Sequence, residues 1–149
     1  QWDFLKHKGA AAVIAVRDDG KLLMVRQYRN TADRQTLEIP AGSRDSLTEP
    51  TLTTASRELE EETGYHSDHL ELLLTLRTAI AYCDEFIDVY VATDLVPTKQ
   101  HLDEDEYVQY EAYTVEELMD KVFRCEIQDS KTVAAILAYN EYRRKQEHN

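Results

Sequence analysis

A cluster of glutamates in the segment RELEEETGY, residues 57–65, is the feature of this sequence best suited to chemistry. On a helix, Glu58, Glu61 and Glu62 occupy positions i, i+3 and i+4, so their carboxylates project from one face. Like charges at this spacing destabilise an exposed helix by about 0.2–0.5 kcal/mol per pair. A divalent cation would turn that repulsion into binding free energy, and carboxylate oxygens suit Mg²⁺, which commonly bridges to substrate phosphates. The pattern therefore indicates metal-assisted phosphoryl chemistry.

The alternative interpretation of this cluster is a solvated acidic face, which is how most adjacent glutamates occur. The surrounding sequence favours the metal site. Leu52, Ala55 and Leu59 form an apolar stripe that would bury the other side of the helix. A glycine-containing loop precedes the helix, and Arg57 lies beside the cluster as a carboxylate partner.

Both ends of the helix that must hold these glutamates are marked in the sequence. Pro50 suits the beginning of a helix, where its missing N–H group costs nothing. Gly64 is the natural residue for a left-handed C-terminal cap. The helix is therefore predicted from Thr51 to Thr63.

The rest of the chain alternates between apolar segments and polar connections. Strands are predicted at residues 10–16, 22–27, 37–39, 70–76, 86–92 and 108–113. The first two are expected to form a hairpin around residues 18–20. Further helices are predicted at residues 115–123, with Thr114 as N-cap, and from Asp129 or Ser130 through Tyr142. This order predicts an α/β (α+β) fold, with a mixed β-sheet covered by helices on both sides.

Length, charge and cysteine content narrow the class of protein. The 149 residues fit one domain, residues 1–149. A formal net charge of −12 argues against nucleic acid or an anionic membrane as the main partner. Cys83 and Cys125 lie far apart, which argues against a disulfide scaffold and a zinc site and predicts a reducing cytoplasm. The longest apolar run, residues 10–16, is too short to span a bilayer.

Gly42, Glu49 and residues 57–65 together resemble the Nudix box, G-x5-E-x7-R-E-U-x-E-E-x-G-U, in which U is an apolar residue. The second half matches at every fixed position, with Tyr65 as a partly apolar final residue. The first half departs from the pattern, because the segment between Gly42 and Glu49, residues 43–48, is one residue longer. Since the spacing from Glu49 to the helix is regular, we expect the loop to bulge and the helix to stay intact.

The resemblance implies a Nudix-like α/β/α sandwich and Mg²⁺ as the cofactor, with Mn²⁺ as a substitute. The metal ligands that it implies are the main-chain carbonyl of Ala41 and the carboxylates of Glu58, Glu61 and Glu62. By the same resemblance, Glu49 is expected to pair with Arg57 and so to orient the helix.

Segments outside the box resemble ADP-ribose pyrophosphatases, a branch of this family: residues 24–29, 37–42, 102–106 and 126–132. This resemblance implies that the substrate is a nucleoside diphosphate linked to another group, and that ADP-ribose is cleaved to AMP and ribose 5-phosphate. Arg29 matches a phosphate-contacting residue, Glu38 is expected to contact substrate or a partner subunit, and Trp2 to stack on adenine. The chain is expected to form a homodimer and to lack an N-terminal strand segment that relatives exchange between subunits.

Catalytic carboxylates are expected in a downstream acidic loop. Glu104 and Glu106 match the residues that orient or deprotonate the attacking water in this branch, and Glu61 of the box is the third candidate. Simpler interpretations exist: a solvated loop for Glu104 and Glu106, a surface residue for Arg29, and a core or interface residue for Trp2.

Residues 78–84 lack the Pro-Gly turn that relatives often show, which is expected to change the ribose side of the pocket. Cys83 in this segment is expected to be a small buried thiol. Substrate identity therefore stays open between ADP-ribose and another nucleotide sugar such as GDP-mannose. A nucleotide-sugar sensor without turnover is the alternative from a different class, and the intact glutamate set argues against it.

Overall fold

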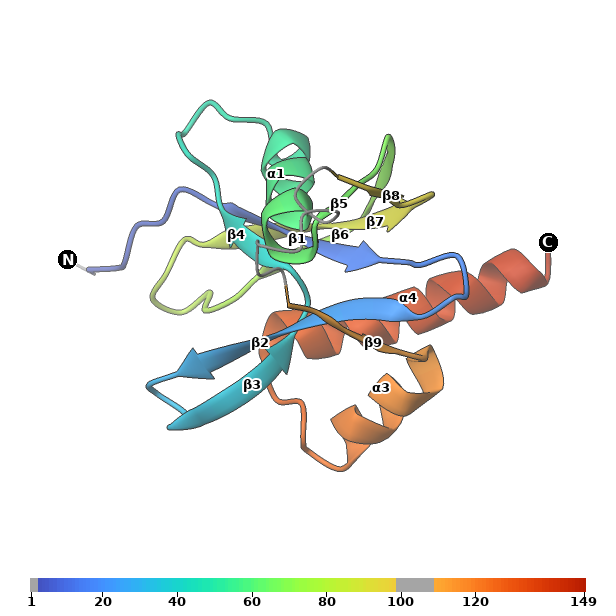
Figure 1. Ribbon diagram of the computed structural model, residues 1–149. Helices are drawn as coiled ribbons and strands as arrows, with labels where there is room; N and C mark the ends of the chain where they lie inside the picture. The colour runs from blue at the N-terminus through green and yellow to red at the C-terminus, as the bar shows by residue number, and fades with distance from the viewer. Residues whose placement is uncertain (1–2, 99–108) are drawn as a thin grey trace.

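The computed structural model describes residues 3–98 and 109–149, and within them a four-stranded mixed sheet lies at the centre (Figure 1). In spatial order the strands are β4 (Ala41–Ser43), β1 (Ala10–Ala15), β7 (Phe86–Thr93) and β6 (His69–Arg77). Strand β1 runs parallel to β7, whereas β4 and β6 are antiparallel to their neighbours. The mixed β-sheet that the sequence predicts is therefore confirmed.

Strand β1 is buried along its whole length because helices cover both faces of the sheet. Its odd-numbered side chains pack in one core with helix α1 (Thr51–Thr63). Its even-numbered side chains pack in a second core, to which α3 (Val115–Phe123) and α4 (Ser130–Glu147) contribute. Figure 1 shows α1 on one side of the sheet and α4 on the other, so the predicted α/β/α sandwich is confirmed.

Within the same described residues, a three-stranded sheet has the order β3 (Arg34–Glu38), β2 (Leu22–Arg29) and β9 (Glu111–Tyr113), and β5 (Tyr65–His66) pairs with β8 (Val96–Pro97). The predicted hairpin between residues 10–16 and 22–27 is wrong. The tight connection is present, with Gly20 at a φ of 84°, but β1 and β2 meet at an isolated bridge between Val16 and Leu22 and then enter different sheets. They separate because β1 needs apolar cover on both faces, whereas the outer half of β2 is largely exposed.

Helix α1 begins after Pro50 and ends at Gly64, which has a left-handed φ of 73°, so its predicted bounds are confirmed. The predicted apolar stripe is wrong at one position, because Leu52 is 47% exposed and Thr54 is buried in its place. Thr54 tolerates burial because its hydroxyl donates a hydrogen bond to the Glu49 carboxylate. This bond also ties the first turn of the helix to the preceding loop.

The C-terminal third of the chain supplies one cover of the sheet. Helix α3 has its predicted bounds, and Thr114 caps it through a capping box. Helix α4 starts after its N-cap Asp129 and continues to Glu147, past the predicted end at Tyr142. Strand β9 covers only the last three residues of the strand predicted at residues 108–113, because the described residues 109 and 110 lie outside it. In the described ranges, no helix is long and apolar enough to cross a membrane.

Replacing Gly64 with alanine is expected to lower the free energy of unfolding by about 1–2 kcal/mol, because a Cβ atom disfavours the left-handed conformation that ends α1. Urea denaturation measures this change. The control is Thr53→Ala on the exposed side of the same helix, which should shift stability by less than about 0.5 kcal/mol. Equal stability of Gly64→Ala and the parent protein would contradict the role of the cap.

Candidate active site

Arg57 connects the loop before α1 to the glutamates on the helix. Its guanidinium lies 2.8 Å from Glu49 Oε1 and 3.0 Å from Glu58 Oε1. Glu49 also accepts a hydrogen bond from Thr54, and the hydrogen bonds from Thr54 and Arg57 hold the pKa of Glu49 below its ordinary value. The structure thus brings Arg57 and Glu49 together, and their ion pair joins the helix to the loop.

The loop between β4 and α1, which is one residue longer than the Nudix pattern, is held by Arg44. Its guanidinium donates hydrogen bonds to the main-chain oxygens of Lys8 and Leu47. The same group lies 5.2 Å from the centre of the Phe86 ring, within the range of a cation–π interaction. These contacts hold the longer loop, and α1 after it keeps its predicted bounds.

Glu58 lies against the main chain of Gly42. A Cβ atom at position 42 would lie 2.1 Å from Glu58 Oε1, which is closer than any side chain allows. Glycine is therefore required for this approach. Burial, followed by repulsion from Glu61, raises the pKa of Glu58 above its ordinary value.

Glu62 is more deeply buried than the other two glutamates of the cluster. Its Oε2 atom is buried and has no hydrogen-bond partner among the described residues. Burial and then repulsion from Glu58 raise the pKa of Glu62 to about 7, against the opposing effect of the Ala41 main chain. Glu62 also lies in the last turn of α1, where the helix dipole disfavours an anion.

The three glutamates do not converge on a single point. Glu61 is exposed, and within the described residues no three His, Cys, Asp or Glu side chains are grouped closely enough to enclose a metal ion. The donor set still fits a hard divalent cation, because Mg²⁺ keeps several waters and needs few protein oxygens. Glu62 Oε2 is the oxygen with most to gain from such a cation, since burying an anion without a partner is unfavourable.

A cavity of about 470 Å³ adjoins this cluster, a volume typical of small-molecule sites. Helix α1 contributes Glu62 to its lining, and β4 contributes Ala41, Gly42 and Ser43. The remainder comes from β2, the β6–β7 loop and the start of α4, and includes Gln27, Arg29, Thr78, Glu85 and Lys131. The structure therefore brings three predicted site residues together, namely Arg29, Ala41 and Glu62.

Glu38 is 1% exposed and lies beneath Arg29, which is at odds with the predicted contact with substrate or a partner subunit. Arg29 Nε and Nη2 lie 2.8 and 2.7 Å from its two carboxylate oxygens, and Lys131 Nζ lies 2.7 Å from Oε1. Burial by itself raises the pKa of Glu38, but hydrogen bonds from Arg29, Lys131 and Thr36 outweigh it and lower the pKa to about 2. Glu38 is therefore a buried anion that holds the side chains of Arg29 and Lys131.

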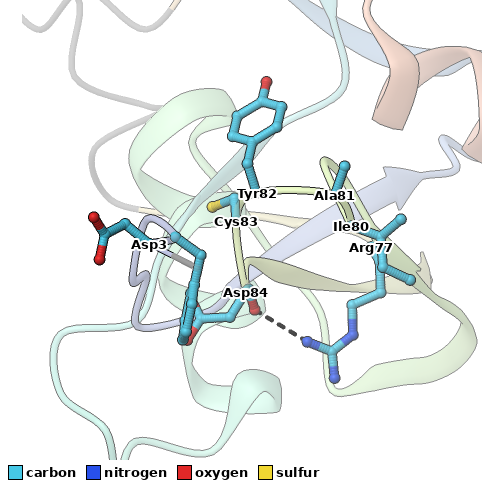
Figure 2. Close-up of a pocket in the computed structure, with 8 residues that line it drawn as sticks. Asp3, Arg77, Ile80, Ala81, Tyr82, Cys83 and Asp84 are labelled. Atoms are coloured by element: carbon cyan, nitrogen blue, oxygen red, sulfur yellow. Dashed lines mark hydrogen bonds between the residues drawn. The ribbon is translucent and has the colours of Figure 1, made fainter. Parts of the chain in front are cut away.

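The β6–β7 loop, which lacks the Pro-Gly turn, separates two cavities. Thr78 donates a 2.7 Å hydrogen bond to Glu85, and both line the cavity beside the glutamates. The rest of the loop lines a second cavity of about 500 Å³, where Arg77 donates a 3.0 Å hydrogen bond to the main-chain oxygen of Asp84 (Figure 2). Cys83 lies at this second cavity and is partly exposed, so the expectation of a buried thiol is wrong.

Three predicted site residues, Trp2, Glu104 and Glu106, lie outside the described residues. Conversely, Lys131 lines the cavity although sequence reasoning assigned it no role. It belongs to a segment that resembles the pyrophosphatases, but its partner Glu38 is 93 positions away in the chain. Local periodicity carries no signal for such a contact.

Comparison with known proteins decides the family. Residues 6–135 match the NUDIX domain. The protein belongs to the NUDIX family. An ADP-ribose pyrophosphatase of Bacillus subtilis (strain 168) is 42% identical to this NUDIX protein over 136 residues, which are 90% of this chain and 73% of that protein.

Two further comparisons agree with this family assignment. A methanol dehydrogenase activator of Bacillus methanolicus is 40% identical over 136 residues, again 90% of this chain and 73% of that protein. A crystal structure of an ADP compounds hydrolase has a TM-score of 0.80 and 26% identity, and the match covers 93% of this chain and 74% of that one. The protein is thus a NUDIX hydrolase, a class of enzyme that uses divalent cations, in keeping with the carboxylates on α1.

Glu38→Gln is expected to destabilise this NUDIX hydrolase at neutral pH and to flatten its response to acid. Because the pKa of Glu38 is lowered from 4.5 to about 2, its stabilisation is fully present above about pH 4.5 and is lost as the pH falls toward 2. Denaturation at pH 7 should show a loss on the order of 2–3 kcal/mol, and the difference should shrink at pH 3. The control is Glu71→Gln, at an exposed position of β6, and parallel pH profiles for Glu38→Gln and the parent would contradict the assignment.

Proposed function

We propose that this NUDIX hydrolase cleaves the diphosphate of ADP-ribose and releases AMP and ribose 5-phosphate. The observation that carries the proposal is the buried, partnerless Glu62 Oε2 at a cavity that Arg29 and Lys131 also line. A desolvated carboxylate attracts a divalent cation, and the nearby cations suit an anionic substrate. The 42% identity to an ADP-ribose pyrophosphatase supports the choice of substrate.

The proposed cofactor is Mg²⁺, with Mn²⁺ as a substitute. The groups that would hold it are the main-chain carbonyl of Ala41 and the carboxylates of Glu58, Glu61 and Glu62. When bound, Mg²⁺ supplies positive charge that stabilises charge developing on the phosphoryl oxygens. The protein prepares this site by holding Glu58 against Gly42 and by keeping Glu62 out of water.

Arg29 is the proposed contact for the diphosphate. Its side chain is 45% exposed and lines the cavity, and a forked guanidinium matches the geometry of phosphate oxygens. The ion pair of Glu49 and Arg57 holds α1 in the orientation that the glutamates need. The positions of Arg29 and α1 are therefore set by separate ion pairs.

The remaining roles rest on the family resemblance. Glu104 or Glu106 orients or deprotonates the attacking water in this proposal, with Glu61 as the third candidate. Trp2 stacks on the adenine. A homodimeric state and a cytoplasmic location belong to the same proposal.

Release of AMP from ADP-ribose, followed by chromatography with and without Mg²⁺, tests the proposed function. Rapid, Mg²⁺-dependent release is expected, with slower cleavage of GDP-mannose and of a nucleoside triphosphate. Faster cleavage of GDP-mannose than of ADP-ribose would assign another nucleotide sugar as the substrate. Binding of ADP-ribose without turnover would instead identify a sensor.

Glu62→Gln is expected to lower kcat by at least about 100-fold, because it removes a ligand charge with little change of volume. Steady-state kinetics at saturating Mg²⁺ measures this loss, and thermal unfolding checks the fold. The matched control is Glu60→Gln on the same helix, which removes the same charge from a side chain that contacts His66 and is not a proposed ligand. Similar kcat values for the two variants would contradict the metal assignment.

A further inference from the structure

We propose that Lys131 is a positioning residue, which holds Glu38 so that the Arg29 guanidinium is presented to the substrate diphosphate. This inference rests on the proposed function and deepens it. It predicts that Lys131 governs affinity for the anionic substrate more than the rate of the chemical step.

Three side chains donate hydrogen bonds to the Glu38 carboxylate. Arg29 binds both carboxylate oxygens, with Nε on Oε2 and Nη2 on Oε1. Lys131 Nζ shares Oε1 with Arg29, and Thr36 Oγ1 shares Oε2. Lys131 and Thr36 each hold one carboxylate oxygen, so the Glu38 carboxylate has a fixed orientation. The Arg29 guanidinium, which binds both oxygens, is therefore fixed as well.

Arg29 keeps a donor for the substrate. Two of its three nitrogens bind Glu38, and Nη1 makes no hydrogen bond to the residues that the structure describes. The side chain is 45% exposed at the cavity, whereas the side chain of Lys131 is 12% exposed. Both cations line the cavity, but Arg29 is the more exposed one and is therefore the group better placed to touch a ligand.

Lys131 is itself fixed by the start of α4. Its Nζ lies 2.8 Å from Asp129 Oδ2, the carboxylate that caps the helix by accepting hydrogen bonds from Thr132. The hydroxyl of Thr132 in turn accepts a 3.2 Å hydrogen bond from the main-chain N–H of Ile39. Two hydrogen bonds thus attach the first turn of α4 to the segment that leads to β4. One joins Lys131 to Glu38, and the other joins Thr132 to Ile39. The same cluster therefore supports the segment just before the proposed metal ligand in β4.

The charge balance of this cluster explains why the Lys131 cation matters. Arg29 and Lys131 offset Glu38 and Asp129, so the four side chains are neutral together. Without the lysine charge the group carries a net negative charge toward an anionic substrate. Arg29 then becomes the remaining cation beside the buried Glu38 carboxylate, so Glu38 offsets more of the guanidinium charge and less of it is available to the diphosphate.

The test compares kcat and KM for ADP-ribose in Lys131→Met, Lys131→Arg and the control Lys145→Met, an exposed lysine on the same helix. Lys131→Met should raise KM about 10-fold or more and change kcat less than about threefold. Lys131→Arg should restore most of the affinity, and Lys145→Met should match the parent. An unchanged KM in folded Lys131→Met, or a loss confined to kcat, would overturn the proposal.

A double-mutant cycle separates positioning from direct substrate contact. If Lys131 acts through Glu38, then Lys131→Met should raise KM much less in a Glu38→Gln background than in the parent. Full additivity of the two changes would overturn the positioning role and assign Lys131 a contact of its own. If Lys131→Met does not fold, Lys131→Gln takes its place in both comparisons. Absence of turnover in the parent protein would count against the proposed function. Turnover in the parent with an unchanged KM in the Lys131 variants would count against this inference alone.

Discussion

Repulsion between partly buried carboxylates, in the last two turns of α1, is the constraint on which this site depends. Glu58 and Glu62 are both partly removed from water and repel one another, at the end of the helix where the dipole disfavours anions. Arg57 does not relieve Glu62, because its guanidinium is engaged by Glu49 and Glu58. A divalent cation would relieve this repulsion, so the feature that makes the free site unfavourable is also the one that favours the proposed metal.

Two parts of the fold position the charged groups of this site. The loop after β4 brings Gly42 against Glu58, and Arg44 fastens that loop to the main chain around it. The hydrogen-bonded cluster centred on Glu38 joins β2, β3 and α4 and places Arg29 at the cavity. The proposed metal-binding carboxylates and the proposed phosphate-binding cation thus come from separate networks of contacts. Their meeting at one cavity is what the proposed binding of a metal and a diphosphate requires.

The sequence predicts the features that are encoded locally. The acidic helix could be read from spacing because one 3.6-residue period places its glutamates on one face, and Gly64 marks its end. Contacts between distant segments could not be read in this way, as the pair of Lys131 and Glu38 shows. The predicted hairpin failed for the same reason, since burial on both faces, not the turn at Gly20, decides the partners of β1.

Anomalous diffraction from crystals grown with Mn²⁺ tests metal binding at Glu62, because it locates the cation without reference to activity. An anomalous peak is expected with Glu62 Oε2 and the main-chain carbonyl of Ala41 in its coordination shell. A peak coordinated elsewhere, with Glu62 Oε2 still buried and without a partner, would contradict metal binding at Glu62.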